Sequence, residues 1–337
     1  MPSSQPSDFI LSLPKAELHL HLEGTISPQI LVELSRRRGA PMELAEAEAM
    51  YQYEDFSGFM LAFKAATEVL RTSEDYELVT YEMMRALRAQ NVVHAEVYVS
   101  AGVVQWRGQE FEPLLEGMEA GRARGQRDFG ISLYWILDAV RHFGPEAGHK
   151  VVDTAVRLRD RNVVGIGIGG DERRAGPELF REVYAAAAAE GLRLTAHAGE
   201  TAGPESIWGS LNVLRAERIG HGLNAWKDQE LVRHLAVKQV PVEVCITSNL
   251  RTGCCETLQH HPVRDYFDAG MLVTLNSDDP AMFGTTLARE YQVAQDAFGF
   301  SEDELRTLAA NSFRASFLPE ERKSEFISQV EARARSA

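Results

Sequence analysis

Two short motifs place histidine side chains where they could bind a metal. In AELHLHL, His19 and His21 are two residues apart, so on a β-strand both imidazoles project from the same face. In LRLTAHAGE, a strand-like run ends near His197 and is followed by Glu200. Each motif alone has an ordinary explanation. Histidines of a buried strand can simply be hydrogen-bonded core residues, and a glutamate is common in the loop that follows a strand. Neither motif alone therefore identifies a site.

Two further motifs add another histidine and a pair of carboxylates. His221 lies between two glycines in RIGHG, which lets a backbone or a ligand approach closely. Asp278 and Asp279 precede Pro280 in NSDDP, a pattern that also suits a helix N-terminus. The four histidines and two aspartates all fall at the C-terminal ends of strand-like runs, and such a shared placement is improbable by chance. Three imidazoles and one carboxylate would suit Zn²⁺ with an open position for water, and Fe²⁺ or Co²⁺ would accept the same ligands.

Eight strand-like runs explain how these residues can meet. Amphipathic stretches with apolar residues three and four positions apart lie between the runs, which indicates strand–helix units and a parallel sheet. Eight such units predict an α/β fold, a (β/α)8 TIM barrel whose strand C-termini converge at one mouth. An open doubly wound sheet is the alternative, but it would favour a glycine-rich first turn, where only Gly24 occurs. The predicted strands are 16–22, 92–99, 131–138, 163–170, 192–199, 217–222, 241–249 and 271–279.

The chain between the first two predicted strands is too long for a simple crossover. Residues 25–90 read as several helices, so we expect a helical insertion that packs over the barrel mouth. Residues 287–335 read as C-terminal helices that complete the outer layer. No Pro- and Ser-rich linker interrupts the sequence, so we expect a single domain over residues 1–337.

Three other histidines are weaker candidates for the site. His94 lies before the end of the second predicted strand and reaches either the mouth or only the core. His142 falls in a helical or loop segment, where we expect it to be solvated. His261 lies in a loop after the seventh predicted strand, and we do not expect it to bind a metal.

The composition narrows the class of protein. Hydrophobic residues make up 45% and charged residues 25% of the 337 residues, as is typical of globular proteins. The chain has 35 basic and 49 acidic residues and a net charge of −14, which disfavours binding to nucleic acid. Three cysteines are too few for a disulfide framework, and neither a signal peptide nor a membrane-spanning run is recognisable. We expect a cytoplasmic protein without nucleic-acid or membrane partners, and a homo-oligomer is compatible with the sequence.

The ordered set of motifs resembles the adenosine deaminase family within the metal-dependent amidohydrolase superfamily. The similar segments span residues 17–291 and occur in the family's order. Any one of them could arise by coincidence, whereas the ordered set is highly specific. The segments are ELHLHLEG, GIGGDE, HAGETAGPESIW, RIGHG, CITSN and SDDPAMFGTTLAREY.

The resemblance implies a metal site and roles for the residues around it. The family pattern makes four residues the ligands of one zinc per chain: His19, His21, His197 and Asp278. Many amidohydrolases hold a second metal through a lysine at the end of strand four. Here that strand is predicted to end in Gly169 and Gly170, which is consistent with a single metal.

The resemblance also implies how the substrate is bound and activated. Glu200 would protonate N1 of a purine, and His221 would orient and deprotonate the attacking water. Asp279 would hold that water or contact N7, the Gly170 backbone N–H would meet N3, and His21 would also face the substrate. Zinc supplies hydroxide at neutral pH by lowering the pKa of water to roughly 7. Glu200 must then stay protonated until the substrate arrives, through burial or a nearby like charge.

A rival pattern of zinc deaminases does not fit. That pattern is H-x-E followed by P-C-x-x-C. His21-Leu22-Glu23 matches the first half, but the sequence contains no P-C-x-x-C. We therefore reject this second type of deaminase site.

The motifs identify the type of reaction more firmly than they identify the substrate. Glu23 stands near the expected ribose 5′ position, where adenosine deaminases commonly have aspartate, and its HLEG form resembles adenine and aminodeoxyfutalosine deaminases. Gly167 stands where family members usually have aspartate. In contrast, HAGETAGPESIW is more similar to the branches that deaminate nucleosides. The favoured hypothesis is deamination of a 6-aminopurine nucleoside, either adenosine or a 5′-modified adenosine such as aminodeoxyfutalosine.

Two other functions compete with this hypothesis. The first is deamination of the free base adenine by an enzyme of the same family. The second is a non-catalytic binding protein that kept the fold. The intact ligand set together with Glu200 and His221 argues against the binding protein, because decayed enzymes usually lose one such residue.

Three further residues are candidates for substrate contacts. Phe59 and Phe63 are four apart on one predicted helix face in the insertion, and they either cover the sugar or its 5′ substituent or only pack the insertion. Arg251 follows CITSN on a loop that we expect to reach the mouth. Its guanidinium would pair with a carboxylate on the 5′ side of the substrate, or else only balance the acidic surface.

Overall fold

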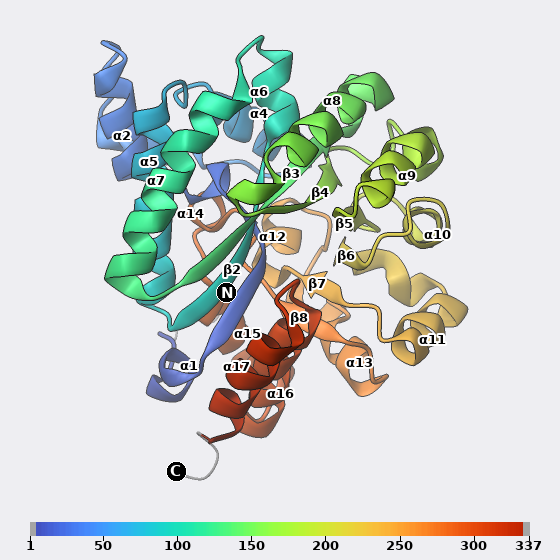
Figure 1. The fold of residues 1–337 in the computed structure, drawn as a ribbon. Coiled ribbons are helices and arrows are strands. Elements are labelled where there is room, and N and C mark those ends of the chain that lie inside the picture. Colours follow the sequence, from blue (N-terminus) through green and yellow to red (C-terminus); the bar gives the residue numbers. More distant parts are fainter. Residues whose placement is uncertain (1–4, 333–337) are drawn as a thin grey trace.

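Eight parallel strands form a nearly closed barrel, as predicted (Figure 1). The computed structural model describes residues 5–332. Strands pair in chain order from β1 to β8, and the ring is completed by a single bridge between Leu20 and Asp278. The strands are β1 (Lys15–His21), β2 (Val92–Val99), β3 (Ser132–Val140), β4 (Val163–Gly169), β5 (Arg193–Ala198), β6 (Arg218–His221), β7 (Val242–Val244) and β8 (Val273–Leu275).

The seventh predicted strand is wrong in its second half. β7 ends at Val244, and Ile246–Arg251 forms helix α12. Ile246 and Thr247 are β-branched and favour a strand locally, but the neighbouring strands β6 and β8 offer no edge to pair with there. The backbone N–H of Asn249 instead donates to the Cys245 carbonyl at 3.0 Å, which closes a helical turn. This turn brings Ser248 within 2.6 Å of Asp278 and Asn249 within 3.2 Å of His221.

Helices fill the connections between the strands. Between β1 and β2 lie α2 (Pro28–Arg37), α3 (Leu44–Met50), α4 (Phe56–Thr67) and α5 (Ser73–Arg88), which confirms the helical insertion. The C-terminal helices are α15 (Leu287–Phe298), α16 (Glu302–Ala315) and α17 (Glu320–Ala332). The others are α1 (Asp8–Ser12), α6 (Ala101–Trp106), α7 (Phe111–Phe129), α8 (Gly144–Arg157), α9 (Arg181–Ala189), α10 (Pro204–Asn212), α11 (Gln229–Lys238), α13 (Val263–Asp268) and α14 (Pro280–Phe283).

The two ends of the barrel are covered by different helices. In Figure 1, α1, α16 and α17 lie at the lower end, where β1 begins, and α4 and α6 lie at the upper end. Helix α16 packs against both β1 and β8. Several helices begin with side-chain caps that their sequences predict, such as the capping boxes of Thr72 and Asp75 in α5 and of Ser301 and Glu304 in α16.

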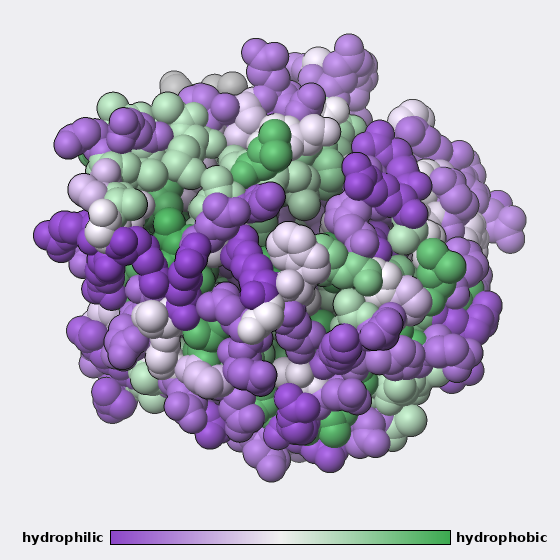
Figure 2. All heavy atoms as spheres, turned by 90° about the horizontal axis from the view of Figure 1, so that it is seen from above, coloured by the Kyte–Doolittle hydropathy of each residue, from purple (hydrophilic) through white to green (hydrophobic). Residues whose placement is uncertain are grey.

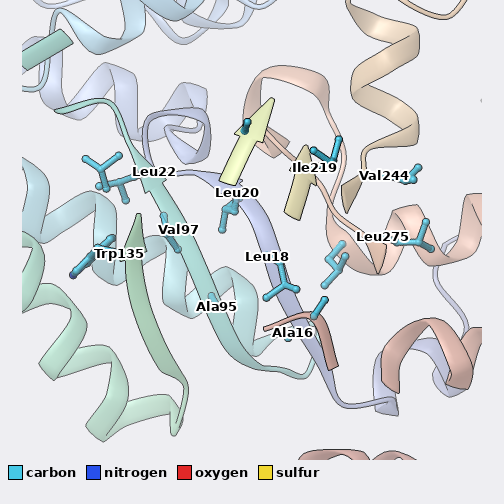
Figure 3. Packing of buried hydrophobic residues seen from close by; sticks show 14 of the residues in the cluster. Ala16, Leu18, Leu20, Leu22, Ala95, Val97, Trp135, Ile219, Val244 and Leu275 are labelled. Carbon is cyan, nitrogen blue, oxygen red and sulfur yellow. The ribbon is translucent and has the colours of Figure 1, made fainter. Parts of the chain in front are cut away.

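The side chains that point into the barrel are polar, whereas the side chains on the opposite face of the strands are apolar. In β1 the even-numbered residues Ala16, Leu18 and Leu20 belong to the hydrophobic core, together with Ala95 and Val97 of β2 (Figure 3). The odd-numbered residues of β1 are Lys15, Glu17, His19 and His21, and all are buried on the opposite face. Most TIM barrels fill this interior with branched aliphatic side chains, so the polar interior must be held together by hydrogen bonds and ion pairs.

An ion-pair network occupies the barrel interior below the histidines. Arg218 pairs with Glu96, and its Nε lies 2.6 Å from Glu243 Oε1. Burial alone would raise the pKa of Glu96, but the adjacent Arg218 guanidinium outweighs it and holds that pKa at about 2. His94 Nε2 lies 3.1 Å from Glu96 Oε1, so His94 belongs to the core rather than to the mouth. Within residues 5–332, no helix is long and apolar enough to cross a membrane.

Candidate metal centre and active site

Four side chains from three strands converge at the C-terminal end of the barrel. His21 Nε2 lies 3.1 Å from His197 Nε2 and 3.3 Å from Asp278 Oδ1. His19 Nε2 lies 3.5 Å from the same Asp278 oxygen. The four ligand atoms fall within 4.8 Å of one another, and none of the four residues is more than 7% exposed. The sequence prediction that these residues meet is confirmed.

The chemistry of this cluster fits a metal cation. Burial lowers the pKa of His21 to about 4 and lowers the pKa of His197 well below its usual range, so both imidazoles are neutral and can act as ligands. Within residues 5–332, His19 Nε2 is buried without a hydrogen-bond partner although it faces the cluster. A cation bound here would satisfy that nitrogen and neutralise Asp278. Three imidazole nitrogens and one carboxylate oxygen are an ordinary donor set for Zn²⁺.

The backbone at two of these motifs adopts the left-handed conformation. His221 has φ of 61° and Asp278 has φ of 63°, a conformation that is uncommon for non-glycine residues. A side chain at Gly220 would begin 2.6 Å from His19 Cε1, so only glycine leaves room for the metal-site histidine. The RIGHG motif is therefore explained by close packing as well as by the position of His221.

Several hydrogen bonds hold the cluster in place. Glu243 Oε2 lies 2.8 Å from His19 Nδ1, and it also accepts from the Tyr98 hydroxyl at 3.3 Å. Ser248 donates to Asp278 Oδ2 at 2.6 Å. Partners of this kind orient the ligands of a metal and fix the histidine tautomers. Sequence analysis missed Glu243 and Tyr98, although a glutamate inside the apolar PVEVC strand is a signal that could have found Glu243.

His221 and Glu200 lie together on one side of the cluster. His221 Nε2 is 3.8 Å from Glu200 Oε2 and 4.0 Å from Asp278 Oδ2. Burial raises the pKa of Glu200 well above its usual range, and the negative charges of Asp278 and Glu172 raise it further. This shift favours the protonated acid, the form that the resemblance implies for Glu200.

The backbone around Glu200 is clamped by a second glutamate. Glu172 accepts hydrogen bonds from the backbone N–H groups of Gly199 at 2.7 Å, Glu200 at 2.8 Å and Thr201 at 2.9 Å, and also from the Ser206 hydroxyl. Successive N–H groups of this kind form a nest that binds an anion. Here the buried carboxylate of Glu172 fills the nest. The GGDE motif thus carries a residue that supports Glu200.

Asp279 and Asp138 add two buried carboxyl groups to the site. Asp279 begins α14, but its side chain does not cap that helix, which leaves the carboxyl group available to the cavity. Burial and the neighbouring Asp278 raise the pKa of Asp279 well above its usual range. Asp138 on β3 occupies the space that a side chain at Gly167 would need, because its Oδ1 lies 2.6 Å from the expected Cβ position. Position 167 thus has a glycine where family members usually have an aspartate, and an aspartate of the neighbouring strand takes up the space beside it.

A cavity of about 520 Å³ opens over the cluster. Its inner part contains His21, His197, Glu200, His221 and both adjacent aspartates, and Gly170 lines it as predicted. Its outer part is lined by Phe56, Phe59, Met60, Leu61, Phe63, Lys64, Trp106, Arg107, His142, Phe143 and Arg174. The ring centroid of Phe63 lies 6.4 Å from that of His21, so the insertion reaches the site from above. His142 is exposed, as expected of a solvated residue, and it also lines the cavity.

Two of the predicted substrate residues are placed differently. Among the described residues that line the cavity, neither Glu23 nor Arg251 occurs. Arg251 is the last residue of α12 rather than part of a loop, and its guanidinium donates to the Tyr51 carbonyl at 3.0 Å and lies over the Tyr53 ring. Glu23 is buried and accepts from the backbone N–H of Ser100 at 2.9 Å.

Comparisons with known proteins agree with the geometry. The family model described as adenosine deaminase matches residues 14–333. An aminodeoxyfutalosine deaminase from Streptomyces avermitilis is 39% identical over 96% of this chain and 92% of its own length. An adenine deaminase from Bordetella avium is 38% identical over 90% of this chain and 97% of its own length.

Two solved structures share the fold. The crystal structure of an adenine deaminase from Arthrobacter aurescens has a TM-score of 0.92 and 33% identity, and the match covers 96% of this chain and 100% of that one. An amidohydrolase from Burkholderia ambifaria with bound zinc has a TM-score of 0.91 and 28% identity, covering 99% and 96% of the two chains. With the motifs, the barrel and the His–His–His–Asp cluster in place, this chain belongs to the adenosine deaminase family of metal-dependent amidohydrolase enzymes.

Proposed function

We propose that the protein binds one zinc ion per chain and deaminates a 6-aminopurine nucleoside by hydrolysis, releasing ammonia and the 6-oxo product. The favoured substrate is a 5′-modified adenosine such as aminodeoxyfutalosine. The observation that carries the proposal is the position of Glu200, whose pKa burial raises well above its usual range, beside His221 and next to the metal cluster. An acid and a second hydrogen-bonding group beside a metal are what hydrolytic deamination of a purine requires.

The proposed chemistry assigns one task to each residue. Zinc held by His19, His21, His197 and Asp278 would make water nucleophilic at neutral pH by lowering its pKa to about 7. Glu200 would donate its proton to N1 of the purine, which makes C6 electrophilic. His221 and Asp279 would hold the attacking water on the side of the ring that faces Asp278. The Gly170 backbone N–H would fix the ring through N3.

Proton transfer to the leaving group completes the reaction. Once Glu200 has given up its proton, its carboxylate can accept one from the attacking water and pass it on to the departing amine, and it regains a proton from the new C6 hydroxyl group as the carbonyl forms. His221 lies within 4 Å of both Glu200 and Asp278, so it can stabilise the charge that moves between them. Burial of all these groups excludes bulk water from the proton transfers.

The outer part of the cavity supports an extended substrate. A cavity of about 520 Å³ lies within the range of roughly 300–1,000 Å³ in which pockets enclose drug-sized ligands, and a bare purine would fill only part of it. Its rim carries exposed apolar side chains, Leu61 at 69% and Trp106 at 61% exposure. Seen from above, hydrophobic side chains appear among mostly hydrophilic ones (Figure 2). Exposed apolar groups at a cavity mouth suit an apolar extension of the substrate.

Cationic side chains at the same rim favour a negatively charged extension. Lys64 and Arg174 line the outer cavity of a chain whose net charge is −14. A carboxylate on the 5′ side, which aminodeoxyfutalosine has and adenosine lacks, would meet these groups. The aminodeoxyfutalosine deaminase from Streptomyces avermitilis, at 39% identity, supports the same choice.

Deamination of free adenine is the second candidate function. It is favoured by the structural likeness to the adenine deaminase from Arthrobacter aurescens and by the Bordetella avium relative. An adenine deaminase would act without ribose and would leave the outer cavity to solvent. The two candidates share the metal and Glu200, so only the substrate distinguishes them.

A substrate screen with metal analysis tests the proposal. Ammonia release is measured from adenine, adenosine, 5′-substituted adenosines and aminodeoxyfutalosine, with Glu200→Gln as the control for contaminating activity. We expect the highest kcat/KM for a 5′-modified nucleoside and about one zinc per chain. A higher kcat/KM for adenine would favour the second candidate. No ammonia from any of these purines, or two tightly held metals per chain, would contradict the proposal.

A further inference from the structure

A chain of buried hydrogen bonds runs from His221 away from the cavity. Asn249 Nδ2 lies 3.2 Å from His221 Nδ1, and Asn249 Oδ1 lies 3.2 Å from His261 Nε2. His261 Nδ1 accepts from the backbone N–H of Val263 at 3.3 Å. His221, Asn249 and His261 are all at least 95% buried, so bulk water does not compete for these bonds. None of the roles assigned so far uses Asn249 or His261.

We propose that Asn249 and His261 are positioning residues that fix the tautomer of His221, with the proton on Nε2, so that His221 faces the reacting centre as a hydrogen-bond donor. The proposal rests on the proposed function for its catalytic meaning. The tautomer itself is a property of the folded protein and does not depend on any substrate.

A backbone N–H group determines which atom donates and which accepts in each of these hydrogen bonds. An amide N–H of the main chain can only donate, so His261 Nδ1 must be an acceptor and the neutral imidazole carries its proton on Nε2. His261 Nε2–H then donates to an acceptor, which must be the amide oxygen of Asn249. The amide nitrogen of Asn249 consequently points at His221 and donates to Nδ1. A neutral His221 whose Nδ1 accepts must carry its proton on Nε2.

The opposite assignment of donors and acceptors is excluded at the hydrogen bond between His261 and Val263. If the amide of Asn249 were flipped, its nitrogen would donate to His261 Nε2, and the proton of His261 would move to Nδ1. Two N–H groups, from His261 Nδ1 and Val263, would then face each other across 3.3 Å. Burial lowers the pKa of His261 to about 3, which also disfavours an imidazolium with protons on both nitrogens. Doubly protonated His221 is disfavoured in the same way, because its Nδ1–H would meet the Asn249 amide N–H.

The fixed tautomer changes what His221 can do. Its Nε2–H lies within 4 Å of Glu200 Oε2 and Asp278 Oδ2, where the attacking water is proposed to sit. A donor at this place orients a lone pair of the water oxygen and stabilises negative charge on it, but it cannot take the proton of the water. The sequence-based expectation that His221 deprotonates the water is therefore replaced by a donor role, and the acceptor must be a carboxylate.

Nitrogen NMR of the zinc-loaded protein measures the tautomer directly. With ¹⁵N-labelled histidine, the two ring nitrogens of a neutral imidazole give separate signals for the protonated and unprotonated positions. His221→Gln and His261→Gln identify the two residues by difference. We expect the proton on Nε2 in both His221 and His261. A proton on Nδ1 of His221, or on both of its nitrogens, would overturn the proposal.

Asn249→Asp keeps nearly the same side-chain shape and should reverse the tautomer of His221. A carboxylate can only accept, so Nδ1 of His221 should gain the proton and Nε2 should lose it, with kcat/KM falling on the order of tenfold or more, as wrong-tautomer substitutions do in other enzymes. Asn224→Asp is the matched control, because Asn224 donates to the Glu200 and Ala202 carbonyls and lies outside the chain of bonds. It should leave the His221 signals unchanged.

A second variant covers the case in which Asn249→Asp does not fold. His261→Phe removes the hydrogen bond that fixes the orientation of the Asn249 amide. His221 should therefore populate both tautomers. Wild-type His221 signals in either folded variant would overturn the proposal. Failure of the proposed function is separate, because an enzyme that releases no ammonia from any 6-aminopurine still reports its tautomer by NMR.

Discussion

The metal cluster and the outer rim of the cavity are built in opposite ways. The cluster, defined as His19, His21, His197 and Asp278, lies on or just after strands β1, β5 and β8 and is almost fully buried. The rim, defined as Leu61, Lys64, Trp106, His142 and Arg174, lies on helices α4 and α6 and in the connections after β3 and β4, and it is exposed. Each cluster residue is fixed by neighbouring strands, whereas the rim side chains have few constraints.

This difference separates the two tasks of the enzyme. Chemistry at a metal needs atoms held to fractions of an ångström, which strands and buried hydrogen bonds provide. Choice among substrates requires only modest differences in free energy, which exposed side chains at a mouth can supply. We therefore expect substitutions in the cluster to abolish activity and substitutions in the rim to change selectivity.

Loss of one cluster ligand should remove metal and activity together. His197→Ala deletes an imidazole whose Nε2 is 3.1 Å from that of His21, and it leaves two imidazoles and one carboxylate. We expect the purified variant to contain little zinc and to have no measurable deaminase activity. Elemental analysis and ammonia release check both quantities. A variant that kept full metal occupancy would show that His197 is not a ligand.

Loss of the acid should abolish activity without loss of metal. Glu200→Gln keeps the shape of the side chain, and Glu200 is not part of the cluster. General acid–base groups contribute about 10²–10⁴-fold to rates, so kcat should fall by that amount while zinc content stays at the wild-type level. Elemental analysis and steady-state kinetics on the preferred substrate measure both. Near wild-type turnover at full occupancy would refute the role of Glu200.

The cluster was predictable from the sequence, and the reason is geometric. Strand periodicity places His19 and His21 on one face, and the barrel brings the C-terminal ends of all strands together, so spacing and fold class suffice. Glu172, Asn249 and His261 could not be assigned in this way. Each acts through hydrogen bonds to residues that are distant in sequence, and these bonds depend on loops whose path the sequence pattern does not determine.

The substrate contacts were predicted less well than the cluster, for a related reason. Phe59 and Phe63 line the cavity because helical periodicity placed them on one face. Arg251 was misplaced because CITSN resembles a strand and the chain instead forms the short helix α12, which turns the guanidinium toward Tyr51. Loop and helix-end positions depend on tertiary contacts, so the direction of a side chain there is not set by local sequence.

Removal of the charge that supports the acid should have an intermediate effect. Glu172→Gln keeps part of the clamp on the Gly199–Thr201 loop but removes a negative charge that raises the pKa of Glu200. The pKa of Glu200 should therefore fall. Because the protonated form is the active one, activity is lost as pH rises through this pKa, and the alkaline limb of kcat/KM should move to lower pH. The pH dependence of kcat/KM for the variant and for the wild type measures this displacement.

The matched control for this prediction is Asn224→Ala. Asn224 holds the carbonyls of the same loop through its amide, at 3.2 Å from Glu200 O and 2.9 Å from Ala202 O, without carrying a charge. A loss of loop order should lower kcat in the control but leave the alkaline limb in place. If Glu172→Gln also left the limb in place, Glu172 would support Glu200 through geometry alone.

The smallest effect is expected at the rim, and it distinguishes two arginines. The Arg174 side chain is exposed, lines the outer cavity and lies 3.7 Å from Asp171, whereas Arg251 is held by the Tyr51 carbonyl outside the cavity. For Arg174→Ala we expect the ratio of kcat/KM for aminodeoxyfutalosine to that for adenosine to fall by about two- to fivefold, because exposed ion pairs contribute about 0.2–1 kcal/mol. Arg251→Ala should leave the ratio unchanged. The reverse result, a lower ratio for Arg251→Ala only, would mean that the substrate extends toward α12 and that the rim does not select it.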